Sequence, residues 1–305
     1  MLEILPNEII LLIFSFLELT ELHRTFSSLN FRFKSLLYNN DTPLYARLVS
    51  NVTLPLDSFL HRISQLSLID WTPNDILLLF KKSNLPRLNY LAVESSNNNY
   101  FGRPTNDLIH QILCLPNLSK CKVKISPTLY ILDILLSASH SIQHLDLSMI
   151  TLDMLFSLLI NVPKLRSLNV WLNSNGRIFD SKTYREYYCL NLTKLTIVLH
   201  NDIKFDEVIF LLKHMPILHS FQMFGSVWDR GFLNEKQWKY MILGENSFPL
   251  LNKIKISLDI RYTVSMQNVS SILSQFNQQV FHQTNFFITS DKMFWFYLTC
   301  FWNSL

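Results

Sequence analysis

PNLSKCKVKI, residues 116–125, is the stretch of sequence that decides the fold. Its apolar residues follow the frame apolar-x-x-apolar-x-apolar, at Leu118, Cys121 and Val123, and lysines occupy the positions around the last two. Alternation with a period of two is typical of a strand that buries one face. Pro116 lies two residues before the first of these apolar anchors, where it stops a preceding helix. The stretch therefore predicts a short strand that follows a helix.

The same frame recurs along most of the chain. Its anchors are Ile63/Leu66/Leu68, Leu88/Leu91/Val93, Leu118/Cys121/Val123, Ile142/Leu145/Leu147, Leu165/Leu168/Val170, Leu192/Leu195/Ile197, Leu218/Phe221/Met223 and Leu251/Ile254/Ile256. Successive first anchors are about 23 to 33 residues apart, in or just above the range of about 20 to 29 residues that is typical of leucine-rich repeats. Pro86, Pro163, Pro216 and Pro249 hold the same place before their anchors as Pro116, which supports the frame independently.

Helical patterns lie between the predicted strands. We expect helices over residues 75–82, 107–114, 129–137, 152–160 and 206–214. Thr72-Pro73 and Ser126-Pro127 each place a capping hydroxyl before a proline at the first helical position. One strand and one helix per repeat predict an α/β solenoid, with a curved parallel sheet inside and helices outside. The pattern resembles the intracellular leucine-rich repeats, although the asparagine or cysteine that usually follows the third anchor is not evident.

LPNEIILLIFSFL, residues 5–17, predicts a first helix that begins near Pro6 and is apolar nearly all round. A small domain covers one face of such a helix, so the other face needs a partner. Thr20 is expected to cap a second helix, and Asn30 separates that helix from a third. The sequence therefore opens with three short helices.

These residues resemble the F-box, the motif that docks on the Skp adaptor of SCF ubiquitin ligases. The resemblance covers residues 3–45 and rests on the L-P-x-E opening, on I-F-x-x-L after it, and on the segment Asn30-Phe31-Arg32-Phe33; Phe33 stands where many members have tryptophan. It implies an adaptor-binding surface made of Leu5, Pro6, Ile9, Ile13, Phe14, Leu17, Leu22 and Phe33. The alternative is an ordinary helical cap on the repeats.

Four segments follow from these patterns. We expect the F-box at 1–48, a junction at 49–60, the leucine-rich-repeat horseshoe at 61–290, and an aromatic C-terminal cap or tail at 291–305. The junction should leave the F-box a separate cooperative unit. The tail, which holds aromatic residues without the repeat frame, either covers the last repeat or folds back over the concave face.

Composition argues against several classes of function. The chain has five glycines, from which neither G-x-G-x-x-G nor a P-loop can be assembled. The nine histidines form no H-E-x-x-H motif, and the four cysteines form no C-x-x-C pair. A net charge of +4 without a basic run indicates no general nucleic-acid surface. We therefore expect a protein that is not an enzyme, with no catalytic residues, no cofactor and no metal.

The apolar segment 9–17 is too short to span a bilayer, and its flanking glutamates do not suit a secretory signal. The scattered cysteines favour a reduced compartment, cytoplasmic or nuclear. We expect no membrane and no nucleic acid among the partners.

Function is then expected on the outward face of the strands. The residues between the anchors supply a candidate substrate-binding surface: Tyr90, Lys120, Lys122, Lys124, His144, Trp171, Lys194, Phe224, Lys253 and Lys255. Alternating lysines fit a solvated polar face, and they also fit a basic groove for an acidic or phosphorylated protein substrate.

The resemblance implies a substrate-recognition adaptor of an SCF ubiquitin ligase, which binds the Skp adaptor and, through it, the cullin scaffold. The alternative is a leucine-rich-repeat interaction scaffold whose F-box is vestigial or acts outside any ligase.

Overall fold

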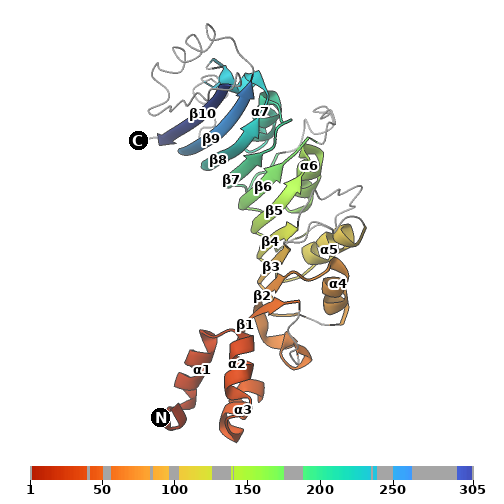
Figure 1. Cartoon of the computed structure of the whole chain (residues 1–305), viewed down its shortest axis with the longest axis vertical. Coiled ribbons are helices and arrows are strands. Elements are labelled where there is room, and N and C mark those ends of the chain that lie inside the picture. The colour runs from red at the N-terminus through yellow and green to blue at the C-terminus, as the bar shows by residue number, and fades with distance from the viewer. Residues whose placement is uncertain are drawn as a thin grey trace. The chain divides into compact units, whose positions relative to one another are not determined.

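The computed structural model describes residues 2–39, 42–50, 56–82, 85–95, 103–125, 139, 141–174, 188–234, 236–238, 250–262 and 294–303. The chain divides into two compact units, Met1–Ser148 and Met149–Leu305. Each unit is an α/β structure in which helices and parallel strands alternate along the chain (Figure 1).

The first unit opens with a helix cluster: η1 (Leu2–Ile4), α1 (Asn7–Ser15), α2 (Leu19–Phe26) and α3 (Phe31–Asn39). Aromatic side chains fill its interior. The ring centroids of Phe14 and Phe26 are 4.8 Å apart, and those of Phe26 and Phe33 are 5.4 Å apart. The expected three short helices are therefore present.

The cap of α2 differs from the expectation. Thr20 lies inside the helix, and the N-cap residue is Glu18. The Glu21 carboxylate accepts a hydrogen bond from the Glu18 backbone N–H at 3.4 Å, as in a capping box. Glu18 and Glu21 therefore stand at the start of α2, and the threonine hydroxyl does not cap it.

The strands of the first unit are β1 (Leu44–Val49), β2 (Ile63–Ile69), β3 (Tyr90–Ser95), β4 (Lys120–Ile125) and β5 (His144–Ile150), which ends just beyond the boundary between the units. Each pairs in parallel with the next. Short helices η2 (Leu56–Ser58) and η3 (Leu60–Arg62) precede β2, and α4 (Pro73–Lys82) and α5 (Arg103–Leu113) lie together beside the strands (Figure 1).

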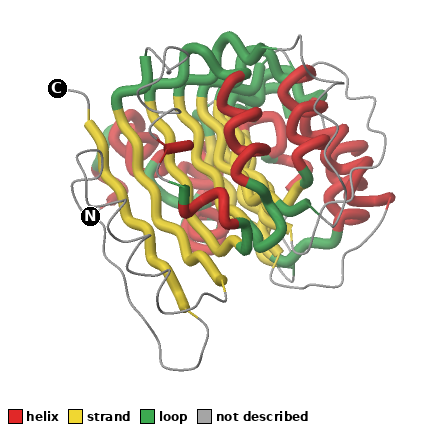
Figure 2. The backbone as a smooth tube through the Cα atoms, turned by 90° about the horizontal axis from the view of Figure 1, so that it is seen from above, coloured by secondary structure: helices red, strands yellow, loops and turns green. Residues whose placement is uncertain are grey.

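The second unit holds α6 (Leu152–Asn161), β6 (Ser167–Leu172), β7 (Lys194–Leu199), α7 (Phe205–Lys213), β8 (Ser220–Val227), η4 (Arg230–Leu233), β9 (Lys253–Tyr262) and β10 (Phe294–Asn303). Strands β6 to β9 pair in parallel in chain order, and β10 pairs antiparallel with β9. In each unit the strands run side by side (Figure 2).

The repeat frame is confirmed by burial. All the anchors of the eight predicted strands are buried, and a strand is present at each of them. Leu66, Leu91, Cys121 and Leu145 stand in register across β2 to β5, and Leu168, Leu195, Phe221 and Ile254 across β6 to β9. The anchors therefore form one continuous apolar face on each set of strands, against which the helices pack.

Helices appear at four of the five predicted places; residues 129–137 lie outside the described residues, as does Ser126-Pro127. Thr72 caps α4 as expected, because its hydroxyl accepts a hydrogen bond from the backbone N–H of Asp75 at 3.2 Å. Thr151 caps α6 in the same way, through the N–H of Met154 at 3.4 Å.

Polar side chains also link consecutive repeats. Asn117 donates its amide N–H to the carbonyl of Pro86 at 2.7 Å, and Asn191 donates to that of Pro163 at 2.7 Å. Both asparagines directly precede the first anchor of their repeat. The asparagines that link repeats thus stand before the first anchor, and not after the third anchor, where leucine-rich repeats usually have an asparagine or a cysteine.

Residues on both sides of the repeat frame also form strands. Strand β1 falls within the segment 1–48, yet it pairs with β2 and so belongs to the sheet. The aromatic tail forms β10, which covers the edge of β9 along its whole length, from Lys253↔Asn303 to Tyr262↔Phe294.

Candidate functional site

The first candidate surface lies on the helix cluster. Seven large apolar side chains are exposed there, three of them by more than four fifths: Leu2, Ile4 (82%), Ile9, Leu12, Phe16 (81%), Leu29 and Phe31 (86%). We refer to these seven residues as the helical surface. Exposed apolar side chains in such number usually mark a binding site for another protein.

Arg32 fastens the opening of the chain to α3. Its guanidinium donates to the side-chain oxygen of Asn7 at 2.9 and 2.7 Å, and to the carbonyls of Glu3 and Leu5 at 2.5 Å. Asn30 adds a hydrogen bond to the Glu3 carboxylate at 2.6 Å. The L-P-N-E turn is thereby held against the start of α3, which brings the neighbourhood of Ile4 beside that of Phe31.

The structure divides the predicted adaptor-binding residues into two groups. Pro6 and Ile9 are exposed, and Leu5, Ile13 and Leu17 are half-buried. Phe14, Leu22 and Phe33 are buried inside the cluster, so their side chains stabilise the helices and are not available to a partner.

Sequence reasoning missed Ile4, Phe16 and Phe31 as surface residues. A helix that is apolar nearly all round gives no sign of which face turns inward. The burial of Ile10 and Phe14 on α1 fixes that direction, and it leaves Ile9, Leu12 and Phe16 outside.

The second candidate surface is the polar face of the strands. In the first unit, Tyr90, Lys120 and His144 stand in register on β3, β4 and β5. Lys122 forms an ion pair with Glu94 at 2.5 Å, and Lys124 forms one with Asp146 at 3.6 Å. The hydrogen bond to Glu94 raises the pKa of Lys122 above its usual value. Carboxylates on neighbouring strands therefore offset the charge of two of the three lysines.

In the second unit the same face forms three rows of residues in register across β6 to β9. The basic row is Ser167, Lys194, Ser220 and Lys253; the amide row is Asn169, Thr196, Gln222 and Lys255; the aromatic row is Trp171, Val198, Phe224 and Ser257. The Lys255 ammonium lies 5.4 Å from the centre of the Phe224 ring, which is a cation–π distance.

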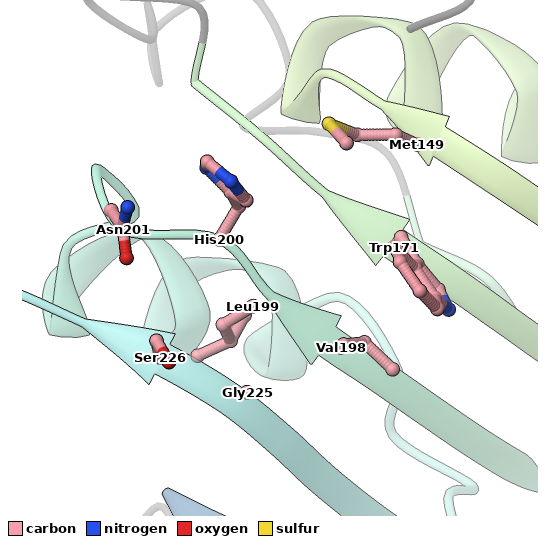
Figure 3. Close-up of a pocket in the computed structure, with 8 residues that line it drawn as sticks. All are labelled: Met149, Trp171, Val198, Leu199, His200, Asn201, Gly225 and Ser226. Carbon is pink, nitrogen blue, oxygen red and sulfur yellow. The ribbon is translucent and has the colours of Figure 1, made fainter. Parts of the chain in front are cut away.

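A pocket of about 350 Å³ opens at the carboxyl ends of these strands (Figure 3). Its lining is Met149, Trp171, Val198, Leu199, His200, Asn201, Gly225 and Ser226. Trp171 is 48% exposed and belongs to the aromatic row. The lining combines apolar groups (a thioether, an indole and aliphatic side chains) with polar groups (an imidazole, an amide and a hydroxyl). Such a pocket suits an apolar ligand group that also makes a few hydrogen bonds.

Gly225 shapes the floor of this pocket. Its φ is +117°, and a Cβ atom there would lie 2.1 Å from the carbonyl oxygen of Leu199. Next to it, the Ser226 hydroxyl donates to the Asp259 carboxylate at 3.1 Å. Of the lining residues, only Trp171 was predicted from the sequence to lie on a binding surface. The others follow the third anchor of their repeats, where the repeat frame assigns no role to a residue.

The described residues contain no group of three or more His, Cys, Asp or Glu side chains that could hold a metal ion. Among the described helices, none is both long and apolar enough to cross a membrane. Cys121 is buried, and burial together with the charge of Asp146 raises its pKa to about 12. Its thiol is an apolar core group.

In comparisons with known proteins, no protein-family model matches the chain, and no curated protein matches it significantly.

Proposed function

We propose that this chain is a substrate receptor of an SCF-type ubiquitin ligase, an F-box protein with leucine-rich repeats. The helix cluster binds the Skp adaptor and, through it, the cullin scaffold, and the strand face binds the protein that is to be ubiquitinated. The chain itself catalyses no step, because the receptor acts by raising the concentration of substrate near the ubiquitin-loaded enzyme.

The exposure of the helical surface is the observation that supports this proposal best. Ile4, Phe16 and Phe31 are each more than four fifths exposed on a cluster whose own core is already filled by Phe14, Phe26 and Phe33. The L-P-N-E turn that resembles the F-box is fixed beside this surface by Arg32. A folded cluster that leaves large apolar side chains in water is suited to docking.

The repeats support the second half of the proposal. Their anchors are buried, whereas the residues between the anchors form rows of polar, basic and aromatic side chains in register on neighbouring strands. Stacked repeats of this kind present extended surfaces that suit protein ligands.

Introduction of negative charge on the helical surface tests the adaptor-binding half. Phe16→Asp with Phe31→Asp places two carboxylates where an apolar interface would remove water, which is expected to weaken adaptor binding by about 3 kcal/mol or more, a factor of about 100. Co-purification of the Skp adaptor with the full chain is the measurement. Phe14 is left unchanged, because an aspartate in its buried position would unfold the cluster.

Leu78→Asp is the matched control, since Leu78 is 52% exposed on α4, away from the helix cluster. This variant should retain the adaptor. Undiminished adaptor binding by the Phe16→Asp, Phe31→Asp variant, with its melting temperature unchanged, would reject the assignment. Adaptor capture without any cullin would instead indicate a scaffold that acts outside a ligase.

A further inference from the structure

The second unit holds most of the lysine charge that the strand face leaves unmatched. Lys194 and Lys253 are exposed, and within the described part of the chain neither forms an ion pair. The carboxylate that stands on the same face, Asp259, accepts a hydrogen bond from Ser226. Lys122 and Lys124 of the first unit each have a carboxylate partner. An anionic ligand therefore gains more from the second unit than from the first.

The rows of the second unit are spaced to match an extended peptide. Residues two apart on a strand are about 6.7 Å apart, and the alternate residues of an extended peptide have the same spacing. Trp171, Asn169 and Ser167 follow one another at this interval on β6, as do Phe224, Gln222 and Ser220 on β8. Consider a peptide that runs along the strands, whose alternate side chains face the sheet. Three successive sheet-facing side chains would contact the aromatic row, the amide row and the basic row in turn.

The pocket lies at the aromatic end of this track. Trp171 and Val198 belong both to the aromatic row and to the pocket lining (Figure 3). A volume of about 350 Å³ is enough for one large side chain. Lys255, over the Phe224 ring, stands one row from the aromatic row, and Lys194 and Lys253 stand two rows away.

We propose that the second unit binds an extended acidic peptide of a partner protein, with one aromatic side chain in the Trp171 pocket and carboxylates two and four residues away on Lys255, Lys194 and Lys253. This rests on the proposed function, for which it names the class of substrate segment.

Carboxylate fits this surface better than phosphate. The three rows and the pocket lining contain no arginine, the side chain whose planar fork binds phosphate through two hydrogen bonds. Lys194 and Lys253 lie two strands apart, about 10 Å between their backbones, so they suit two single charges better than one double charge.

The test uses the full chain and two fluorescein-labelled peptides, Ser-Ser-Trp-Ser-Glu-Ser-Glu-Ser-Ser and the same residues in reverse order. Fluorescence anisotropy should show saturable binding of one of them. Replacement of both glutamates by glutamine should weaken that binding by about tenfold, and salt raised from about 0.05 to 0.5 M should weaken it as well, because the charges are exposed.

Two variants examine the two halves of the site. Trp171→Ala should weaken binding by about tenfold or more through loss of the aromatic contact. Lys194→Glu with Lys253→Glu should weaken binding by about tenfold and remove most of its salt dependence. Tyr188→Ala, an exposed aromatic outside the site, and Lys213→Glu, at an exposed position of α7, are matched controls that should bind like the wild type.

Three results of these measurements would overturn the proposal or part of it. Binding of neither peptide, or equal losses in the control variants, overturns the proposal. A phosphoserine peptide that binds about tenfold tighter than the glutamate peptide, through the same lysines, overturns the choice of carboxylate. The adaptor plays no part in the anisotropy measurement, so loss of adaptor binding and loss of peptide binding are recorded independently, and either can fail alone.

Discussion

Arg62 joins the helix cluster to the sheet of the first unit. Its side chain is 0% exposed and donates to the carbonyls of Leu37, near the end of α3, and Thr42, just before β1. A guanidinium in this place satisfies backbone groups at the end of a helix, where carbonyls have no partner in the helix itself.

Arg62→Ala should therefore destabilise the chain by about 2 to 4 kcal/mol, since it leaves buried carbonyls without these donors and opens a cavity. Urea unfolding followed by circular dichroism measures the change. Arg87→Ala, which alters an exposed arginine, is the control and should alter the free energy of unfolding by less than about 0.5 kcal/mol. Equal effects from the two variants would contradict the role given to Arg62.

Cys114, Cys121 and Cys189 differ in what surrounds their thiols. Cys114 is exposed, whereas Cys121 and Cys189 are buried, and burial raises the pKa of both buried thiols. Because the thiolate is the reactive form, iodoacetamide at about pH 8 should label Cys114 in the folded chain and spare Cys121 and Cys189. Mass spectrometry of tryptic peptides reports the labelling, and unfolding in urea should make all three reactive. Rapid labelling of Cys121 in the folded chain would show that its repeat opens readily.

The burial of single residues was easier to predict from the sequence than their side-chain partners were. The sequence placed Cys121 in the core through its position in the frame, and the structure confirms it. It could not show that Glu94 and Asp146 would pair with Lys122 and Lys124, because that depends on the register between strands far apart in the chain.

At the scale of single elements, β8 depends on Gly225. The residue adopts φ +117° opposite Leu199, a conformation that side chains other than glycine rarely adopt. Gly225→Ala should destabilise the chain by about 2 kcal/mol or more, since the new Cβ would meet backbone atoms of Leu199 that cannot move aside. Thermal unfolding measures this change. Ser226→Ala, at the next position, should cost about 1 kcal/mol through its hydrogen bond to Asp259. A smaller loss for Gly225→Ala than for Ser226→Ala would argue against strain at this strand.

Strand β1 shows where the sequence pattern was too weak. Leu44, Ala46 and Leu48 alternate and are all buried, but they lack the first anchor and the preceding proline of the later repeats. A short alternation next to three helices gives little reason to choose a strand. The longer frame predicted all the remaining parallel strands, β2 to β9. It occurs eight times, which makes a chance match improbable for any one strand.

At the scale of the whole molecule, β10 protects the end of the sheet in the second unit. It pairs with all ten residues of β9, so the backbone groups of that long strand are not left as an open edge. A chain that ends at residue 293 should associate through β9 at concentrations where the full chain is monomeric. Size-exclusion chromatography with light scattering measures this. Removal of only Ser304 and Leu305, which follow β10, is the control and should leave the mass unchanged.

The outermost parallel strand is covered differently in the two units. In the first unit the helix cluster packs on β1, and in the second unit the antiparallel strand β10 pairs with β9. The sequence predicted helices before the first strand. For the aromatic tail it allowed either a cap on the last repeat or a tail folded over the strand face, because the tail lacks the repeat frame that shows which side chains face inward. Solenoids require such closures, because each repeat leaves an apolar face that the next one must cover.

The asparagine links have a consequence for how such a chain changes over generations. Asn117 and Asn191 each donate to a proline carbonyl of the repeat immediately before, and Ser119 and Thr193 likewise donate to carbonyls one repeat back, at 3.1 Å each. Every repeat built this way brings its own donors and presents a carbonyl for its successor. The repeat anchored at Leu165 has Lys164 and Arg166 at the two donor positions, so the links belong to particular repeats. An in-frame duplication of residues 190–215 would insert a repeat that brings Asn191 and Thr193 with it, so the sheet can lengthen by a whole repeat while these links are retained.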